Sequence, residues 1–367
     1  MSQIIFQYTV RSEPSAIQER AEALLLEQTV ELPRKALADS WVNEHIVGKV
    51  LEVTRIGEDF FSLIISHPLR TTALDPAQFL NVAFGNSSLQ PDVTLDNIEA
   101  PIELFAKFKG PKFGIESIRA KVGVQHRALT CTALKPMGLP ADRLARLAYD
   151  FAIAGLDMIK DDHGLADHEF CSFQSRVEEC QTAVEKANAE TGLSTIYIPN
   201  LIGSPETVYK QLEFARQRGV GGIMISPMLV GPALLHELAD GKAGLPIFAH
   251  PAFGGAMRIA PQVLLGQIFK WFGADAVIFP HHGGRFSYSR ETCLKLAEFS
   301  RSTSHGLHPA FPVPAGGIKT SRVREVLEFY GKETILLVGG SLLESGSELV
   351  AKAKEFVAEV AEVSKSL

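Results

Sequence analysis

Four consecutive polar residues, Lys160-Asp161-Asp162-His163, follow the largely apolar run 155–159. Charged side chains at the end of a buried strand are costly unless they form ion pairs, bind a metal or take part in a reaction. Asp162 offers the oxygen atoms that Mg²⁺ prefers, and Lys160 would offer similar oxygens once CO2 had converted its amine to a carbamate. His163 is either a third ligand or a proton carrier, because imidazole titrates near neutrality. The alternative is a helix N-terminus that the acids merely cap.

Lys135 stands at the end of the preceding strand candidate, residues 128–134. A lysine whose pKa is lowered by burial or by nearby positive charge can move protons at neutral pH. We therefore expect Lys135 to act as a proton carrier. The alternative is a salt bridge to Asp161 or Asp162.

Polar residues also end the later strand candidates. Asn200, Ser226 and His250 end three of them, and His281-His282-Gly283-Gly284-Arg285 follows a fourth. We expect Asn200, Ser226, His250 and His281 to position a substrate, and the glycine-containing loop to close over an anion with Arg285 at its tip. The alternatives are a core histidine at position 250 and an exposed loop with incidental histidines.

Two glycine pairs, Gly316-Gly317 and Gly339-Gly340, follow the last two strand candidates. Glycine allows a backbone to approach a ligand closely and to adopt unusual φ values. Barrel enzymes often bind phosphate with the loops after their seventh and eighth strands. The two pairs, with Arg285, therefore predict a phosphate site.

The elements that must position these residues follow a regular order. From about residue 128, short apolar runs alternate with segments of helical spacing, which predicts a (β/α)8 TIM barrel over residues 109–367. A doubly wound sheet rarely reaches eight regular repeats. Residues 1–108 mix strands and helices without strict alternation, which predicts an α+β, ferredoxin-like N-terminal domain. The expected barrel strands are 128–134, 158–162, 195–200, 222–226, 246–250, 276–280, 310–315 and 335–338.

Composition excludes several classes of partner. The net charge is -6, which argues against nucleic acid because a nucleic-acid-binding protein needs a basic face. No apolar run reaches the ~18 residues that a membrane span needs. The N-terminus lacks the pattern of a signal peptide, so we expect a cytoplasmic protein.

The motifs resemble the large subunit of ribulose-bisphosphate carboxylase, and more closely its non-carboxylating relatives, the RuBisCO-like proteins. Residues 155–162 are similar to the family's metal-site strand, and 131–136 to the segment with its proton-transfer lysine. Residues 314–318 and 338–340 are similar to its phosphate loops. The resemblance implies that Mg²⁺ is held by carbamylated Lys160 and by Asp162. Glu27 and Asn81 look like family residues that reach the barrel of a second subunit, which implies a homodimer with shared active sites.

Several positions depart from the carboxylases. His163 stands where the family has a metal-binding glutamate, and Met137-Gly138 stands where carboxylases have a second lysine. The arginine with which carboxylases bind the second phosphate of their substrate is missing. Arg285 is only an approximate substitute for the lysine of their mobile loop. A bisphosphate would leave one dianion poorly paired in a partly dry pocket. We therefore expect a sugar monophosphate substrate and no CO2 fixation.

The resemblance then implies an isomerase that abstracts a proton next to a carbonyl through a metal-stabilised enediolate. The expected substrate is 5-methylthioribulose 1-phosphate, in methylthioadenosine and methionine salvage. In this interpretation Asn200, Ser226 and His250 position the sugar hydroxyls. The family alternatives are a 2,3-diketo-5-methylthiopentyl-1-phosphate enolase and a decarboxylase of a branched sugar-acid phosphate. The alternative of another class is an idle relative that binds a metabolite, although the retained Lys135, Lys160 and Asp162 speak against it.

Overall fold

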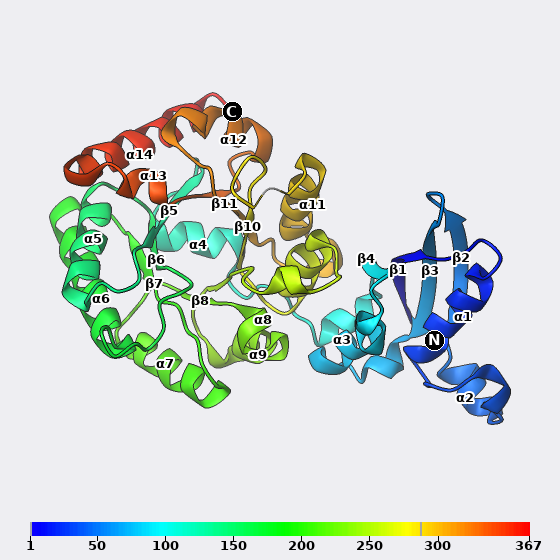
Figure 1. Cartoon of the computed structure of the whole chain (residues 1–367). Coiled ribbons are helices and arrows are strands. Elements are labelled where there is room, and N and C mark those ends of the chain that lie inside the picture. The colour runs from blue at the N-terminus through cyan, green and yellow to red at the C-terminus, as the bar shows by residue number, and fades with distance from the viewer. Residues whose placement is uncertain (1, 287) are drawn as a thin grey trace.

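The computed structural model describes residues 2–286 and 288–367. Its strands form an antiparallel sheet of four strands and a parallel sheet of eight. Figure 1 shows the parallel strands inside a ring of helices, with the antiparallel sheet in a separate lobe. The expected fold class, a (β/α)8 barrel after an α+β domain, is confirmed. The boundary near residue 108 remains a prediction.

The N-terminal lobe has the order of elements that defines a ferredoxin-like unit. Its sheet has the strand order β2-β3-β1-β4. In β1 the alternation of the sequence buries every second residue, from Ile4 to Val10, against the helices. Asp75 caps α3 through the backbone N–H of Gln78, and Pro76 opens that helix. The elements are β1 (Gln3–Arg11), α1 (Ile17–Glu27), α2 (Ser40–His45), β2 (Lys49–Arg55), β3 (Phe60–Pro68), α3 (Pro76–Phe84) and β4 (Val93–Glu99).

All eight expected barrel strands are present within a residue or two of their expected bounds. They pair in the order β7-β6-β5-β12-β11-β10-β9-β8. The ends of this sheet meet where the N–H of Met224 donates to Pro199 O at 2.9 Å and the N–H of Leu201 donates to Met224 O at 2.8 Å. The strands are β5 (Leu129–Leu134), β6 (Met158–Asp161), β7 (Ile196–Ile198), β8 (Ile223–Ile225), β9 (Ile247–Ala249), β10 (Ala276–Pro280), β11 (Phe311–Ala315) and β12 (Ile335–Val338).

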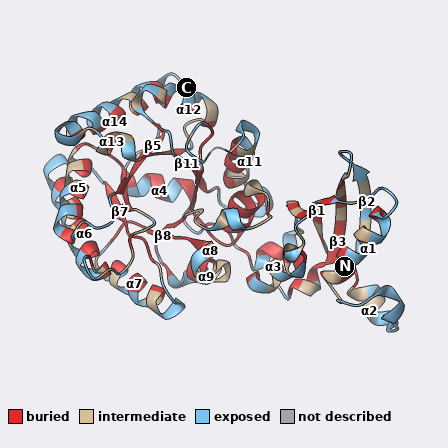
Figure 2. Cartoon of the chain, in the orientation of Figure 1, coloured by how far each residue is buried: buried red, intermediate tan, exposed pale blue. Residues whose placement is uncertain are grey.

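Side chains of alternate strand residues fill the barrel interior. This inner core includes Cys131, Met158, Ile198, Phe248 and Ile278, and helix α4 (Gly114–Val122) closes the end of the barrel nearest the strand starts. The intervening residues face outward and pack against the surrounding helices. Figure 2 accordingly shows buried strands and inner helix faces, with exposed outer helix faces.

The barrel helices follow the expected order, with local differences. Gly231, which has φ 103°, separates helix α8 (Pro227–Val230) from helix α9 (Pro232–Glu237). The helical segment that ends in α10 (Phe269–Trp271) begins as π-helical turns, Gln262–Ile268. Helix α4 and strand β4 were not expected. Among the described residues, no helix has the length and apolarity needed to cross a membrane. The remaining helices are α5 (Ala141–Ile153), α6 (Phe173–Thr191), α7 (Pro205–Gln217), α8 (Pro227–Val230), α9 (Pro232–Glu237), α10 (Phe269–Trp271), α11 (Arg290–Arg301), α12 (Val323–Tyr330), α13 (Gly340–Leu343) and α14 (Leu349–Lys365).

Candidate active site

Asp161, the last residue of β6, and Asp162, which follows it, point in opposite directions. Lys160 and Asp162 continue the inward series that begins at Met158, whereas Asp161 faces the helix layer. There the Asp161 carboxylate accepts from Arg176 Nε at 2.9 Å, from Tyr197 OH at 2.7 Å and from the backbone N–H of Asn200 at 3.0 Å. Asp161 is therefore a buried structural group that joins β6 to α6 and β7.

Asp162 lies at the centre of a polar group at the barrel mouth, whose other members are Lys135, Lys160, His163 and His250. Lys135 Nζ is 2.7 Å from its Oδ1, and His163 Nδ1 is 3.6 Å from its Oδ2. Burial alone would raise the pKa of Asp162, but the contacts with His163 and Lys135 and the charge of Lys160 hold it well below its usual range. Asp162 is thus ionised at neutral pH. The structure selects Asp162 over Asp161 as the partner in the salt bridge considered for Lys135.

Lys160 is almost fully buried at the wall of this mouth. Its side chain is 3% exposed, and Nζ donates to Asp161 O at 2.9 Å. Burial lowers the pKa of Lys160, with a smaller contribution from the charge of Lys135 in the same direction. The neutral amine, which is the form that reacts with CO2, is therefore more accessible here than on a surface lysine.

His163 and His250 stack on each other beside Asp162. Their ring centroids are 4.4 Å apart and their planes differ by 11°. Nδ1 of His250 accepts from the backbone N–H of Ala252 at 3.1 Å. Burial and the charges of Lys160 and His163 lower the pKa of His250 to about 2. His250 is thus neutral and held by a backbone bond, as the core-histidine alternative expects, although its stacking also places it beside the polar group.

Asn200 and Ser226 each place a buried polar atom near the barrel mouth. Asn200 Nδ2 donates to the carbonyls of His163 and Leu165 at 3.1 and 3.0 Å. Among the described residues, Asn200 Oδ1 and Ser226 Oγ have no hydrogen-bond partner. Unpaired buried polar atoms are rare in native proteins, and a bound ligand is one way to satisfy them.

The glycine pairs leave free space beside their backbones. A side chain added at Gly316, Gly339 or Gly340 would meet no atom within 4 Å. Gly316 and Gly317 have φ values of 88° and 72°, which other residues rarely adopt. Gly317 packs directly against Gly284, whose Cα lies 3.0 Å from the position of an added Cβ. The loop after β10 therefore contacts the loop after β11.

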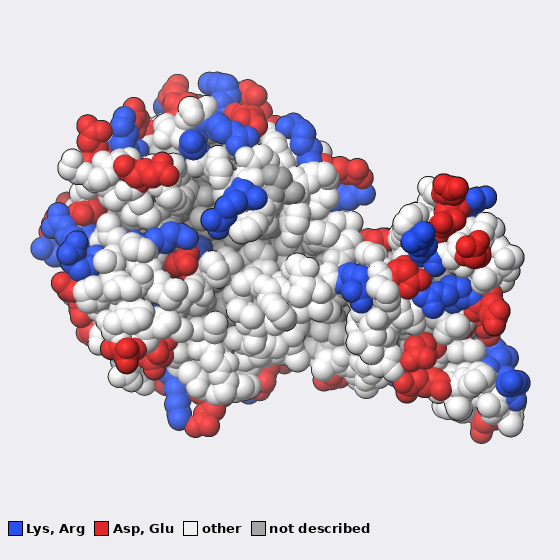
Figure 3. All heavy atoms as spheres, in the orientation of Figure 1, with Lys and Arg blue, Asp and Glu red and all other residues white. Residues whose placement is uncertain are grey.

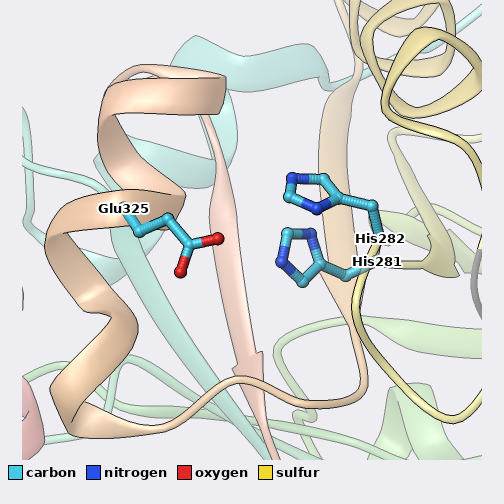
Figure 4. A group of neighbouring side chains, drawn as sticks. All are labelled: His281, His282 and Glu325. Atoms are coloured by element: carbon cyan, nitrogen blue, oxygen red, sulfur yellow. The ribbon is translucent and has the colours of Figure 1, made fainter.

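The histidines after β10 lie away from this polar group. His281 and His282 are buried, so the exposed-loop alternative is wrong for them. His281 Nδ1 is 3.0 Å from the hydroxyl of Tyr330 on α12, and Figure 4 shows both rings beside Glu325 of the same helix. Arg285 is exposed, with its guanidinium 4.6 Å from the centre of the Phe286 ring.

Glu27 and Asn81 lie on the N-terminal lobe. Glu27 accepts from Asn86 Nδ2 at 3.0 Å, and Asn81 Nδ2 donates to Gln78 at 3.3 Å. Both contacts stay within the lobe. Figure 3 shows acidic and basic groups interspersed over the lobe and around the barrel face.

The family model described as ribulose bisphosphate carboxylase large chain, catalytic domain, matches residues 114–266 of this chain. The 5-methylthioribulose-1-phosphate isomerase of Rhodospirillum rubrum is 44% identical over 96% of this chain and 95% of its own length. The chain belongs to the RuBisCO large-chain family. A 2,3-diketo-5-methylthiopentyl-1-phosphate enolase of Geobacillus kaustophilus is 31% identical over 93% of this chain and 88% of its own length. The crystal structure of a Rubisco-like protein from Rhodopseudomonas palustris has a TM-score of 0.92 and 41% identity, covering 99% of this chain and 98% of that one.

Two groups of side-chain contacts in this chain escaped the sequence interpretation. Arg176 and Tyr197, which hold Asp161, lie on the following helix and strand. The available signal was the position of Asp161 next to inward-facing Lys160, since neighbouring residues of a strand face opposite sides. Glu325 stands within an ordinary amphipathic helix, and nothing in its sequence neighbourhood pointed to His281 or His282.

Proposed function

We propose that this RuBisCO-like protein is an isomerase of a sugar monophosphate, and that its substrate is 5-methylthioribulose 1-phosphate. The observation that carries the proposal is the 2.7 Å contact between Lys135 Nζ and ionised Asp162 at the mouth of the barrel. Once its ammonium group has released a proton, the amine held there can accept one from the carbon next to a carbonyl and return it to the neighbouring carbon. The similarity to the R. rubrum isomerase supports this choice of substrate.

The other side chains have separate tasks in this proposal. Lys135, whose side chain is 40% exposed, carries the proton between carbon atoms. The backbones of Gly316, Gly317, Gly339 and Gly340, with Arg285, bind the phosphate. Asn200 Oδ1 accepts a hydrogen bond from one sugar hydroxyl, and Ser226 Oγ donates to or accepts from another, next to His250. His281 has no such task, because its ring packs against Tyr330.

Lys160, Asp162 and His163 would hold Mg²⁺. Three charged groups decide whether a cation can bind: Lys135, Lys160 and Asp162. If Lys160 is an unmodified ammonium group, the two positive charges exceed the single negative charge of Asp162 and would repel a cation. A carbamate on Lys160 replaces a positive charge by a negative one, so the same three groups would then carry a net charge of about -1 and two carboxylate-like ligands. Bound Mg²⁺ would stabilise the oxygen anion of the enediolate.

We propose further that two chains share each active site. Glu27 and Asn81 lie on the N-terminal lobe with partners only from that lobe among their described hydrogen bonds. In a homodimer they would complete the mouth of the partner's barrel. We propose the same division of the chain for both subunits, an N-terminal domain of residues 1–108 and a barrel domain of residues 109–367.

The test is to incubate the protein with 5-methylthioribulose 1-phosphate, Mg²⁺ and bicarbonate in D2O and to follow the sugar by NMR. We expect a new isomeric sugar phosphate that carries solvent deuterium at the reacting carbon. Unchanged substrate without deuterium would refute the isomerase. Lys135→Met is the matched variant and should give neither signal.

The second candidate is the 2,3-diketo-5-methylthiopentyl-1-phosphate enolase, favoured by the G. kaustophilus relative. The same amine and carboxylate would suit its proton abstraction. His163 in place of the family's glutamate weighs against it. The diketone phosphate, supplied separately, discriminates the two: conversion to its enol without isomerisation of the ribulose phosphate would select the enolase.

A further inference from the structure

A second group of side chains that could hold a metal ion lies between the end of β10 and helix α12. Ring nitrogens of His281 and His282 and a carboxylate oxygen of Glu325 all lie within 4.8 Å of one another. Figure 4 shows the Glu325 carboxylate extending from α12 toward the two rings. None of these residues belongs to the polar group around Asp162.

Both histidines present a free nitrogen inside the protein. His281 is 0% exposed and His282 is 8% exposed, and Nε2 of each has no hydrogen-bond partner among the described residues. Burying such atoms unpaired costs free energy, so two of them side by side indicate a missing ligand. The Tyr330 hydroxyl, 3.0 Å from His281 Nδ1, occupies the other nitrogen of that ring and leaves Nε2 to bind.

The protonation states suit a cation. Burial and the charge of His282 lower the pKa of His281 to about 4, and burial also lowers the pKa of His282. Both rings are therefore neutral near pH 7, as metal ligation requires. The nearby charges of Arg290 and Arg322 contribute to these shifts and also oppose a cation.

Glu325 offsets the charge of Arg322. Arg322 forms a bidentate ion pair with its carboxylate: Nε donates to Oε2 at 2.9 Å and Nη2 donates to Oε1 at 2.8 Å. The pair is neutral as a unit, and the contact fixes the carboxylate beside the rings while each oxygen keeps a lone pair. The two imidazole nitrogens then decide which metal ion the group prefers, and they favour Zn²⁺ or Co²⁺ over Mg²⁺.

We propose that His281, His282 and Glu325 form a site for a borderline divalent cation of the Zn²⁺ class. Two imidazoles and one carboxylate are a known ligand set for Zn²⁺, which keeps a fourth position for water. The ion would tie the end of β10 to α12. It would thereby hold Gly283 and Gly284 against Gly317, which they already contact.

The test is a Co²⁺ titration of the metal-free full-length protein with Mg²⁺ in excess, read by visible absorption. Wild type should bind one equivalent with the strong absorption of four- or five-coordinate Co²⁺, and Zn²⁺ should displace it. His282→Gln should abolish this absorption. Glu325→Gln, at an exposed position, should fold normally and weaken binding by at least about tenfold.

Two matched variants locate the ion. Glu328→Gln removes another exposed carboxylate of α12, 3.9 Å from Arg324, and should bind Co²⁺ like wild type. Asp162→Asn should also keep the absorption, because it alters only the other centre. Absorption that is absent from wild type, or that survives in both His282→Gln and Glu325→Gln, would overturn the proposal. Because the readout is spectroscopic, its failure would leave the isomerase proposal unaffected.

Discussion

Replacing Asp161 by asparagine should destabilise the barrel strongly, although Asp161 touches no substrate in our proposal. The Asp161 and Arg176 side chains are both 0% exposed and lie 2.9 Å apart. Asparagine keeps one oxygen, which can still accept from Tyr197. Its amide group would then face the N–H groups of both Arg176 and Asn200, and donors would meet a donor.

The expected cost follows from these contacts. A buried donor left without an acceptor costs about 1–3 kcal/mol, and removing one partner of a buried ion pair costs about 3–5 kcal/mol in total. We therefore expect Asp161→Asn to lower the free energy of unfolding by about 3–5 kcal/mol. The exposed pair Arg11–Asp59, 3.5 Å apart, supplies a control, since Asp59→Asn should cost at most about 1 kcal/mol.

The assay is urea unfolding of wild type, Asp161→Asn, Arg176→Met and the double variant. Because the charges compensate each other, the double variant should lose less stability than the two single losses combined, by at least about 1 kcal/mol. A loss below about 1 kcal/mol for Asp161→Asn would refute the structural role, given the cost expected for such a pair. So would a variant of normal stability that no longer bound Mg²⁺, because Asp161 would then be a ligand.

Three further predictions concern the mouth, the N-terminal lobe and the assembly. Ser226→Ala removes a buried hydroxyl for which the described residues offer no partner, so the free energy of unfolding should stay level or rise by about 1 kcal/mol. Loss of one hydrogen bond to the substrate should raise KM about fivefold at unchanged kcat, and a KM equal to that of wild type would contradict this. Burial lowers the pKa of His67 to about 4 from 6.5, so the unfolded state binds more protons between these values and stability falls as pH falls through that window, by up to about 3 kcal/mol. Urea unfolding at pH 7 and pH 4 should show a shallower dependence for His67→Gln than for wild type or the exposed control His126→Gln; equal slopes for all three would reject the assignment. If sites are shared, mixing inactive Glu27→Gln with inactive Lys135→Met should restore about a quarter of wild-type activity, since half of the dimers are mixed and each has one intact site; no recovery despite subunit exchange would exclude sharing.

The barrel could be predicted from the sequence because each strand has its own local signal. Short apolar runs recur between helical segments, and the polar residues that end them, such as Lys135 and Asp162, must meet at one face of a closed parallel sheet. The sequence left two partners open for Lys135, and only the inward parity of Asp162 decides between them. The phosphate role of the glycine pairs remains a prediction.

The rest depends on contacts between distant segments. Strand β4 carries Thr94, Asp96 and Asn97, which obscure its alternation, and the neighbouring strand β1 supplies the pairing that defines it. His281 follows Pro280, and the alternation of strand residues turns its side chain toward the surrounding helices. Its ring contacts Tyr330, 49 residues away in the chain. Periodicity gives the face of a residue, but not which helix covers that face.

Deuterium exchange by wild type and Lys135→Met is the most direct test of Lys135 as the proton carrier. Both proteins are saturated with 5-methylthioribulose 1-phosphate in D2O, after calorimetry has shown that both bind it. Wild type should incorporate deuterium at the carbon next to the carbonyl, and the variant should do so at least about 100-fold more slowly. Equal exchange rates in the two proteins would contradict the role of Lys135.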